Sequence, residues 1–284
     1  MLSKPDEAMN EQIDQLAEFL DRHRNVLVLT GAGMSTASGI PGYRDEEGVR
    51  RGKPPVQGPE FRGSDALRRR YWARSMVGWP TLARAEPNAG HRALARLESA
   101  GHIGQLITQN VDGLHQRAGS ARMIELHGNI HTVRCLACER RQHRAALQQR
   151  LLRDNPALGG VLAQPLPDGD AQLEPEALHE FIVPDCEHCS GVLQPDVVFF
   201  GDNIPAERTR QALQWMDEAD ALLVVGSSLM VFSGFRFCKI AAAEGKPIAA
   251  VNAGKTRADD LIGLKVALPA QEVLPAVAGL LGAT

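Results

Sequence analysis

The stretch VLVLTGAGMS, residues 26–35, decides the fold of this chain. It starts with a short, continuous apolar run, which is typical of a parallel strand covered on both faces. Similar runs recur downstream, at residues 103–108, 123–126, 221–225 and 247–251, with a weaker one at 265–268. Helical patterns occur at residues 9–23, 91–98, 208–216 and 235–243. Because strands alternate with helices, the sequence predicts an α/β fold with a doubly wound parallel sheet.

Composition narrows the class of protein. The chain has 284 residues, of which 44% are hydrophobic and 23% charged, as in an ordinary soluble globular enzyme. A net charge of −3 argues against a nucleic-acid partner. No apolar run reaches the roughly 18–20 residues that cross a bilayer, so we expect no membrane partner. Acidic residues near the start, such as Asp6 and Glu11, are atypical of an export or transit signal, which predicts a cytoplasmic protein.

The loop after the first strand is rich in small residues, which allow backbone N–H groups to approach a phosphate. The dinucleotide fingerprint G-x-G-x-x-G is only half met, because Thr36 replaces its third glycine. Residues 50–53, RRGK, also lack the acidic residue expected about 20 positions further on. The loop is therefore either a phosphate cradle or a tight strand-to-helix turn. Both interpretations argue against an ordinary dehydrogenase.

Four of the five cysteines form two C-x-x-C pairs: Cys135, Cys138, Cys186 and Cys189. Each pair has the spacing of a knuckle around one tetrahedral ion, which predicts one structural Zn²⁺. Residues 139–185 separate the pairs by 47 residues, against the usual range of about 15–20, so we expect an inserted surface loop. A redox dithiol is the alternative for a single pair. Cys238 lies in an apolar helical stretch and is expected to be a small buried hydrophobe.

Two stretches interrupt the alternation of strands and helices. Residues 39–63 are rich in Gly, Pro and Arg and are expected to be loop, and residues 131–195 hold both cysteine pairs. We therefore predict a sheet domain and a smaller domain formed by two insertions. The sheet domain comprises residues 1–44, 88–130 and 196–284; the helical and loop insertion comprises residues 45–87 and the zinc-binding insertion residues 131–195.

Six motifs in order, with the cysteine pairs among them, carry a family resemblance. They are GAGMSTASGIPGYR at 31–44, TQNVDGLH at 108–115, ELHG at 125–128, PDVVFFGD at 195–202, GSSLMV at 226–231 and VN at 251–252. This series resembles the sirtuin family from about residue 25 to 270. RYWAR at 70–74, VGWP at 77–80, PDGD at 167–170 and Ser233-Gly234 are similar to its class II, mitochondrial-type branch. Gly42 and Asp202 depart from residues common in the family.

The resemblance implies a Rossmann-like sheet domain and a small zinc domain, with NAD and an acylated protein lysine between them. NAD is consumed, and the implied products are free lysine, nicotinamide and O-acyl-ADP-ribose. His127 is the implied general base, and Asn110 and Asp112 are implied to act on the nicotinamide side. The implied cofactor-binding residues are Gly31, Ala32, Gly33, Ser35, Arg44, Gln109, Asn110, Asp112, Gly226, Ser227, Ser228 and Asn252. The peptide is expected to pair with segments that contain Val198, Phe199, Gly201, Leu229 and Val231.

Tyr71 and Arg74 carry a prediction about the acyl group. They are three residues apart on an expected helix and so share a face. They fall where class II sirtuins that remove acidic acyl groups carry a Tyr-x-x-Arg pair, so an acyl group that is acidic or larger than acetyl is expected. An arginine fork meets a carboxylate bidentately, and tyrosine adds a hydrogen bond. The alternative is that Arg74 only solvates a helix face while Tyr71 packs inward.

Two other functions stay open on the sequence alone. A mono-ADP-ribosyltransferase would use the same NAD chemistry with a different acceptor. A zinc-stabilised NAD-sensing or partner-binding module would have no turnover, although a sensor needs no base such as His127.

Overall fold

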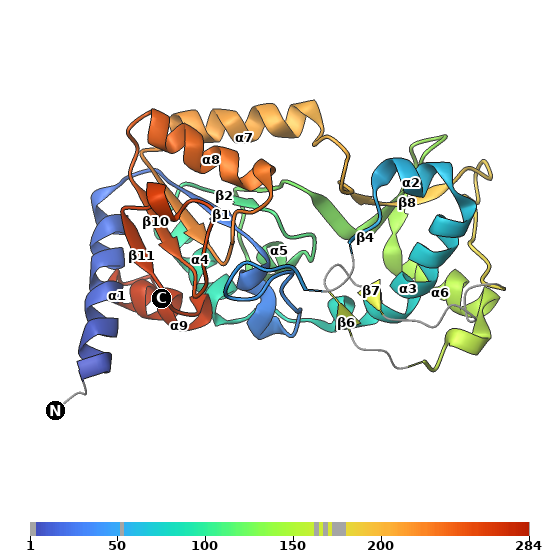
Figure 1. The fold of residues 1–284 in the computed structure, drawn as a ribbon, viewed down its shortest axis with the longest axis horizontal. Helices are drawn as coiled ribbons and strands as arrows, with labels where there is room; N and C mark the ends of the chain where they lie inside the picture. Colours follow the sequence, from blue (N-terminus) through green and yellow to red (C-terminus); the bar gives the residue numbers. More distant parts are fainter. Residues whose placement is uncertain (1–3, 52–53, 162–164, 167–169, 172–179, 284) are drawn as a thin grey trace.

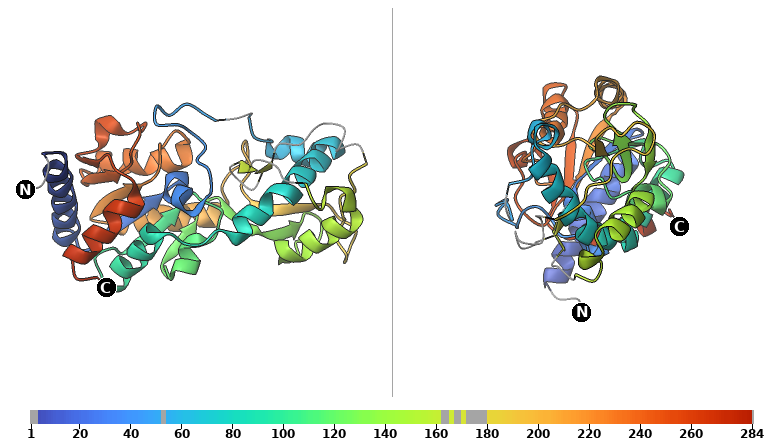
Figure 2. Two further views of the ribbon diagram at one scale, coloured as in Figure 1. Left: turned by 90° about the horizontal axis from the view of Figure 1, so that it is seen from below. Right: turned by 90° about the vertical axis from the view of Figure 1, so that its right-hand side faces the viewer.

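The computed structural model describes residues 4–51, 54–161, 165–166, 170–171 and 180–283. A larger part with a six-stranded sheet and a smaller part with a three-stranded sheet lie side by side (Figures 1 and 2). Residues 167–169 of the PDGD segment lie outside the described residues. In the described ranges, no helix combines the length and the apolar character needed to span a membrane.

The large sheet is parallel throughout, with strand order β11-β10-β9-β1-β2-β3. Its strands are β1 (Val26–Thr30), β2 (Gln105–Thr108), β3 (Met123–Glu125), β9 (Ala221–Val225), β10 (Ile248–Val251) and β11 (Leu264–Val266). The chain runs from β1 towards β2 on one side, and from β9 towards β10 on the other. The loops after β1 and β9 therefore meet at a topological switch point, where open sheets bind ligands. The predicted doubly wound α/β fold is confirmed.

Helices cover both faces of this sheet (Figure 1). On one face lie α1 (Lys4–Arg22), α4 (Ala89–Ser99) and α9 (Ala270–Leu280); on the other lie α7 (Ala206–Glu218) and α8 (Phe232–Ala243). Successive side chains of a strand point to opposite faces. Val28 therefore packs in the cluster with α1, and Leu29 in the cluster with α8, and both are fully buried. This double burial explains the continuous apolar runs in the sequence.

The small part is built on an antiparallel sheet of order β5-β4-β8. Its elements are β4 (Gly128–Cys135), β5 (Arg141–His143), β8 (Leu193–Val197), α2 (Gly58–Gly63), α3 (Asp65–Arg84), α6 (Arg144–Asp154), β6 (Pro165–Leu166) and β7 (Asp170–Ala171). Shorter elements of the chain are η1 (Ala32–Ser38), α5 (Leu114–Ala118), η2 (Pro156–Leu158) and η5 (Asp259–Leu261). Strands β4 and β8 run across the boundaries expected at residues 130 and 195, and the division into domains stays a prediction.

The expectation of loop throughout residues 39–63 is wrong for its last six residues, which form α2. The Glu60 carboxylate accepts a hydrogen bond from the backbone N–H of Gln57 at 3.2 Å, and the two residues form a capping box. Pro59 sits in the first turn, where its missing N–H costs nothing. Phe61 is fully buried and anchors the helix in the small core. The high glycine and proline content of residues 39–63 hides these helix-capping signals in the sequence.

Candidate active site

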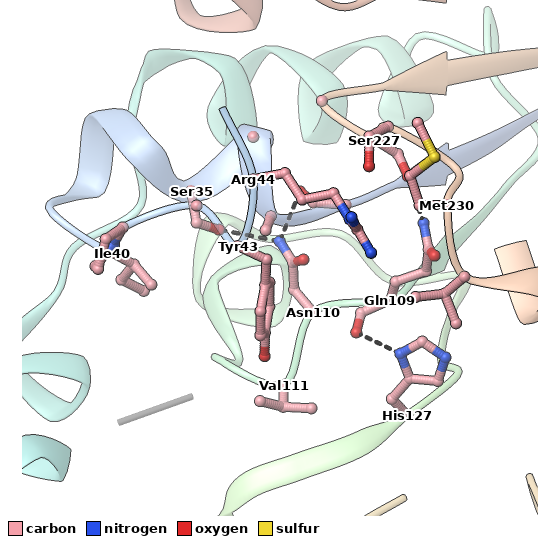
Figure 3. Close-up of a pocket in the computed structure, with 18 of the residues that line it drawn as sticks. Ser35, Ile40, Tyr43, Arg44, Gln109, Asn110, Val111, His127, Ser227 and Met230 are labelled. Carbon is pink, nitrogen blue, oxygen red and sulfur yellow. Dashed lines mark hydrogen bonds between the residues drawn. The ribbon is translucent and has the colours of Figure 1, made fainter. Parts of the chain in front are cut away.

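A cavity of about 720 Å³ opens where the ends of β1, β2, β9 and β10 face the small part. Every predicted cofactor-binding residue lines it, as does His127. Every predicted substrate-binding residue lines it except Arg74. Predicted site residues that lie far apart in the sequence therefore line one cavity, and Figure 3 shows several of them.

The glycines of the first loop have a packing role that the sequence did not reveal. The backbone N–H of Gly33 donates to the carbonyl of Gly226 at 2.8 Å, and that of Gly31 donates to Val225 at 3.1 Å. A Cβ on Gly33 would lie 2.8 Å from the Gly226 oxygen, and a Cβ on Gly31 would lie 2.7 Å from the Ser227 Cβ. The loops after β1 and β9 thus interlock so closely that side chains are excluded at both glycines.

Asn110 and Asp112 follow β2 and are tied to the first loop through Ser35. Asn110 Nδ2 donates to the Gly31 carbonyl at 3.0 Å and to Ser35 Oγ at 3.1 Å, as Figure 3 shows. Ser35 Oγ donates to Asp112 Oδ2 at 2.7 Å, and the Leu114 N–H donates to Oδ1 at 3.0 Å. Burial raises the pKa of Asp112, and these hydrogen bonds partly oppose the rise. The network fixes the Asn110 amide at the cavity wall.

Gln109 joins three strand ends and orients the histidine. Its Nε2 donates to the Thr30 carbonyl at 3.2 Å and to Ser227 Oγ at 2.9 Å. The backbone carbonyl oxygen of Gln109 lies 2.9 Å from Nδ1 of His127 (Figure 3). His127 is in the short connection between β3 and β4. A carbonyl oxygen only accepts, so Nδ1 carries the proton and Nε2 carries the lone pair. Ser233 Oγ lies 2.9 Å from that Nε2 and donates to it.

The surroundings of His127 favour its neutral form. Burial lowers the pKa of this imidazole, while the Gln109 carbonyl raises it and the positive charges of Arg208 and Arg236 lower it again. The net shift is downward. A neutral ring with an accessible lone pair is the state that a general base requires.

Tyr71 and Arg74 differ in their placement. Tyr71 lines the cavity, but Arg74 Nε donates to the carbonyl of Ala171 in β7 at 2.8 Å. A second arginine of the small part, Arg144, lies behind the cavity wall. It is the first residue of α6 and is fully buried. Its guanidinium lies 4.8 Å from the ring centre of Trp79 and 5.4 Å from that of Trp72.

Arg144 is joined to the cavity wall through a hydrogen bond to Ser75. Its Nη2 lies 3.3 Å from the Oγ and the carbonyl of Ser75, which lines the cavity. Among the described residues, its Nε and Nη1 have no hydrogen-bond partner. Burial lowers the pKa of Arg144 to about 10, and the nearby Tyr71 opposes this shift, so the group stays charged at neutral pH.

The four predicted metal ligands form a cluster away from the cavity. The Sγ atoms of Cys135, Cys138, Cys186 and Cys189 all lie within 4.8 Å of one another. The Cys135–Cys189 separation is 3.5 Å and the Cys138–Cys186 separation is 3.8 Å. Thiolates 2.3 Å from one tetrahedral zinc would be about 3.8 Å apart, so the cluster fits a structural Zn²⁺ with no open position. Cys238 is fully buried, as expected.

The sequence missed several residues of the cavity wall. Ile40, Tyr43 and Val111 line it from within motifs whose other members were predicted, and Figure 3 shows all three. Ser75 and Ser233 also line it. Apolar wall residues carry no chemical signal, and Ser233 was noted only as a mark of the family branch.

Comparison with known proteins now fixes the family. The model described as "Sir2 family" matches residues 31–233, most of the chain. This chain belongs to the Sir2 family. The sirtuin is similar to a protein named "NAD-dependent protein deacetylase" from Xanthomonas campestris pv. campestris, with 55% identity over 251 residues, 88% of this chain and 86% of the relative. "NAD-dependent protein deacetylase 3" from Pseudomonas syringae pv. tomato is 52% identical over 253 residues, 89% of this chain and 90% of the relative.

Solved structures agree with this membership. The structure described as "Sir2-p53 peptide-NAD+" has a TM-score of 0.76 and 30% identity, and covers 96% of this sirtuin and 99% of that chain. A "Sir2 homolog-NAD complex" has a TM-score of 0.73 and 28% identity, and covers 95% of this sirtuin and 93% of that chain. The matched regions include both the large sheet and the small part.

Proposed function

We propose that this sirtuin is an NAD-dependent protein deacetylase, or more broadly a protein-lysine deacylase. One acyl-lysine, one NAD and one water give free lysine, nicotinamide and O-acyl-ADP-ribose. The observation that carries the proposal is the neutral, oriented His127 in the same cavity as the Asn110–Ser35–Asp112 network. The names of the relatives at 52–55% identity support the same activity.

The loops after β1, β2, β9 and β10 would hold NAD. In this proposal Gly31, Ala32, Gly33 and Ser35 lie at the pyrophosphate, Arg44 covers it, and Gly226, Ser227, Ser228 and Asn252 lie at the adenosine end. Gln109, Asn110 and Asp112 face the nicotinamide and its ribose. The Asn110 amide is held by two acceptors and so offers a polar group that needs no reorganisation when the nicotinamide bond breaks.

His127 would act in the second stage of the reaction. The acyl oxygen replaces nicotinamide at the ribose C1′, and a ribose hydroxyl then attacks the captured acyl carbon. His127 Nε2 takes the proton from the ribose, because Nδ1 is occupied by the Gln109 carbonyl. The proton would then pass to the departing lysine amine. Water would add to the acyl carbon, and the bond from that carbon to the C1′ oxygen would break to leave the O-acyl ester. The peptide would lie along Val198, Phe199 and Gly201 on one side and Leu229 and Val231 on the other, all of which line the cavity.

We also propose a preference for acyl groups that are acidic or larger than acetyl. Tyr71 and Ser75 line the cavity, and the charged Arg144 donates to the Ser75 hydroxyl at 3.3 Å. A buried cation without a carboxylate partner is costly, and a bound carboxylate offsets that cost. In this proposal the attraction comes from Arg144, which contacts a residue of the cavity wall, whereas Arg74 does not line the cavity.

Branch and location are further parts of the proposal. The segments at 70–74 and 77–80 and Ser233-Gly234 support the class II, mitochondrial-type branch. The thiolate cluster suits a reducing compartment, which supports a cytoplasmic location.

A stoichiometry experiment tests the proposed function. The protein is incubated with an acetyl-lysine or succinyl-lysine peptide and NAD labelled in the adenosine. Deacylase activity predicts equal amounts of free lysine, nicotinamide and soluble acyl-ADP-ribose. Label fixed to protein without loss of acyl groups would identify an ADP-ribosyltransferase instead. Binding of NAD with no turnover on any acyl peptide would identify a sensing or partner-binding module.

A further inference from the structure

The hydroxyl of Ser233 occupies the one acceptor site on the imidazole ring of His127, the proposed base. Ser233 lies in the first turn of α8 and lines the cavity, and its Oγ donates to His127 Nε2 at 2.9 Å. A neutral imidazole has a single lone pair on its unprotonated nitrogen. A ribose hydroxyl that gives its proton to Nε2 must therefore displace Ser233 from that lone pair.

The hydrogen bond also has a second form once the ring is protonated. Nε2–H is then a donor, and a serine oxygen accepts as readily as its O–H donates. Ser233 is half-buried at the start of a helix, so rotation of its side chain moves Oγ without moving the backbone. The same atom can thus serve both protonation states of His127.

We propose that Ser233 is a positioning residue for the base. Its hydroxyl holds neutral His127 with Nε2 towards the cavity, yields to the ribose hydroxyl, and then accepts a hydrogen bond from the protonated ring. The proton on Nε2 comes from the ribose and leaves with the lysine amine, while Ser233 keeps its own proton throughout. This inference rests on the deacylase function proposed above.

Other groups around His127 set the background for a pH test. Arg208 on α7 donates to the Leu126 carbonyl at 3.3 Å, and Arg236 on α8 is the second cation that acts on the ring. On the strand side the ring meets the Gln109 carbonyl. All three stay in place when Ser233 is changed, so a change in titration reports on the hydroxyl.

The test compares Ser233→Ala with Ser233→Thr, which keeps a hydroxyl. The hydrogen bond that the serine oxygen accepts from the charged ring is stronger than the one that its O–H donates to the neutral ring, so loss of the hydroxyl lowers the pKa of His127. We expect Ser233→Ala to move the acidic limb of the kcat/KM profile to lower pH by about half a unit to one unit. We expect kcat to fall about 3- to 10-fold with no rise in KM for NAD. Ser233→Thr should restore both values.

A titration without substrates makes the test independent of turnover. NMR of labelled histidine, with the His127 signal assigned from His127→Ala, should give the same downward shift in Ser233→Ala. Ser99→Ala, which removes an exposed hydroxyl from α4, is the matched control and should match wild type. Wild-type titration and kcat in Ser233→Ala, or a threonine variant that behaves like alanine, would overturn the inference. Failure of the wild type to deacylate would overturn the proposed function instead, while the NMR titration would still test the Ser233–His127 contact.

Discussion

The large sheet and the small zinc-cluster part are held together in different ways. In the sheet, every residue of β1, β9 and β10 is buried, and the apolar faces of helices cover both sides. The small part has a three-stranded sheet, four clustered thiols and a guanidinium beside two indole rings. The comparison teaches that the sheet depends on local apolar runs, whereas the small part combines an apolar core with a thiol cluster that joins distant segments.

The largest effect is expected from breaking the thiol cluster with Cys186→Ser. Structural zinc contributes roughly 10–16 kcal/mol in zinc-finger peptides, more than most domains have in net stability. The variant should lose zinc, and hydrogen exchange should rise in β4, β8 and α6 while β1 and β9 stay protected. Metal analysis and hydrogen exchange by mass spectrometry measure both outcomes.

Cys238→Ala is the matched control, because Cys238 is a buried cysteine outside the cluster. It should keep zinc and lose only about 1–2 kcal/mol of stability. If wild-type protein without zinc kept full activity and slow hydrogen exchange in the small part, this account would be contradicted, because the small part would not depend on its metal.

Asn110→Ala should produce the next largest effect, in the sheet part. The amide side chain touches Gly31 and Ser35 at the cavity, and removal of one preorganised polar group typically costs about 10²–10³-fold in rate. Exchange of labelled nicotinamide into NAD should fall by that factor, with zinc content unchanged. Asn25→Ala is the control, since Asn25 bonds to the Glu218 carbonyl just before β1, away from the cavity. Equal nicotinamide exchange in Asn110→Ala and Asn25→Ala would show that Asn110 has no role in the nicotinamide step.

The smallest effect separates two arginines of the small part. If Arg144 attracts an acidic acyl group, Arg144→Met should lower kcat/KM for succinyl-lysine by about 10- to 150-fold relative to acetyl-lysine. Arg144→Lys should retain part of the preference. Arg74→Met should leave that ratio unchanged, because its Nε is bonded to the Ala171 carbonyl. The reverse pattern would support the Tyr71–Arg74 pair predicted from the sequence.

A substrate pair tests the same idea on wild-type protein, so that misfolding of a buried variant cannot mislead. Succinyl-lysine and its neutral amide analogue have nearly the same size and differ in charge. Preference for the carboxylate supports a cation behind the wall, whereas equal rates would contradict an acidic preference and leave deacetylation intact.

The sheet and its strand ends were predictable from the sequence. Apolar runs such as residues 26–29 indicate doubly buried strands, and polar residues directly after them converge at one edge. The family resemblance singled out the motif that contains Gln109, Asn110 and Asp112, and the fold brings it to this edge, where it lines the cavity. The cysteine cluster followed from spacing alone, since two C-x-x-C pairs have few alternatives.

The strand ends of the small part and the positions of Arg144 and Ser233 depend on long-range contacts, which leave no local signal in the sequence. Strands β4 and β8 pair although they are far apart in the chain, so their ends could not be read from periodicity. The position of Arg144 between two tryptophans is set by the docking of α6 on α3. Ser233 reaches His127 across 106 residues of sequence, and no motif links them.

The central claim is that His127 is the base of NAD-dependent deacylation, and His127→Ala tests it most directly. The variant should fold, bind zinc and NAD, and keep nicotinamide exchange, because that step precedes the base. Deacylation should fall by about 10²–10⁴-fold. His102→Ala, at a histidine that contacts the Leu281 carbonyl outside the cavity, should retain full activity. Near-normal deacylation by His127→Ala would contradict the claim.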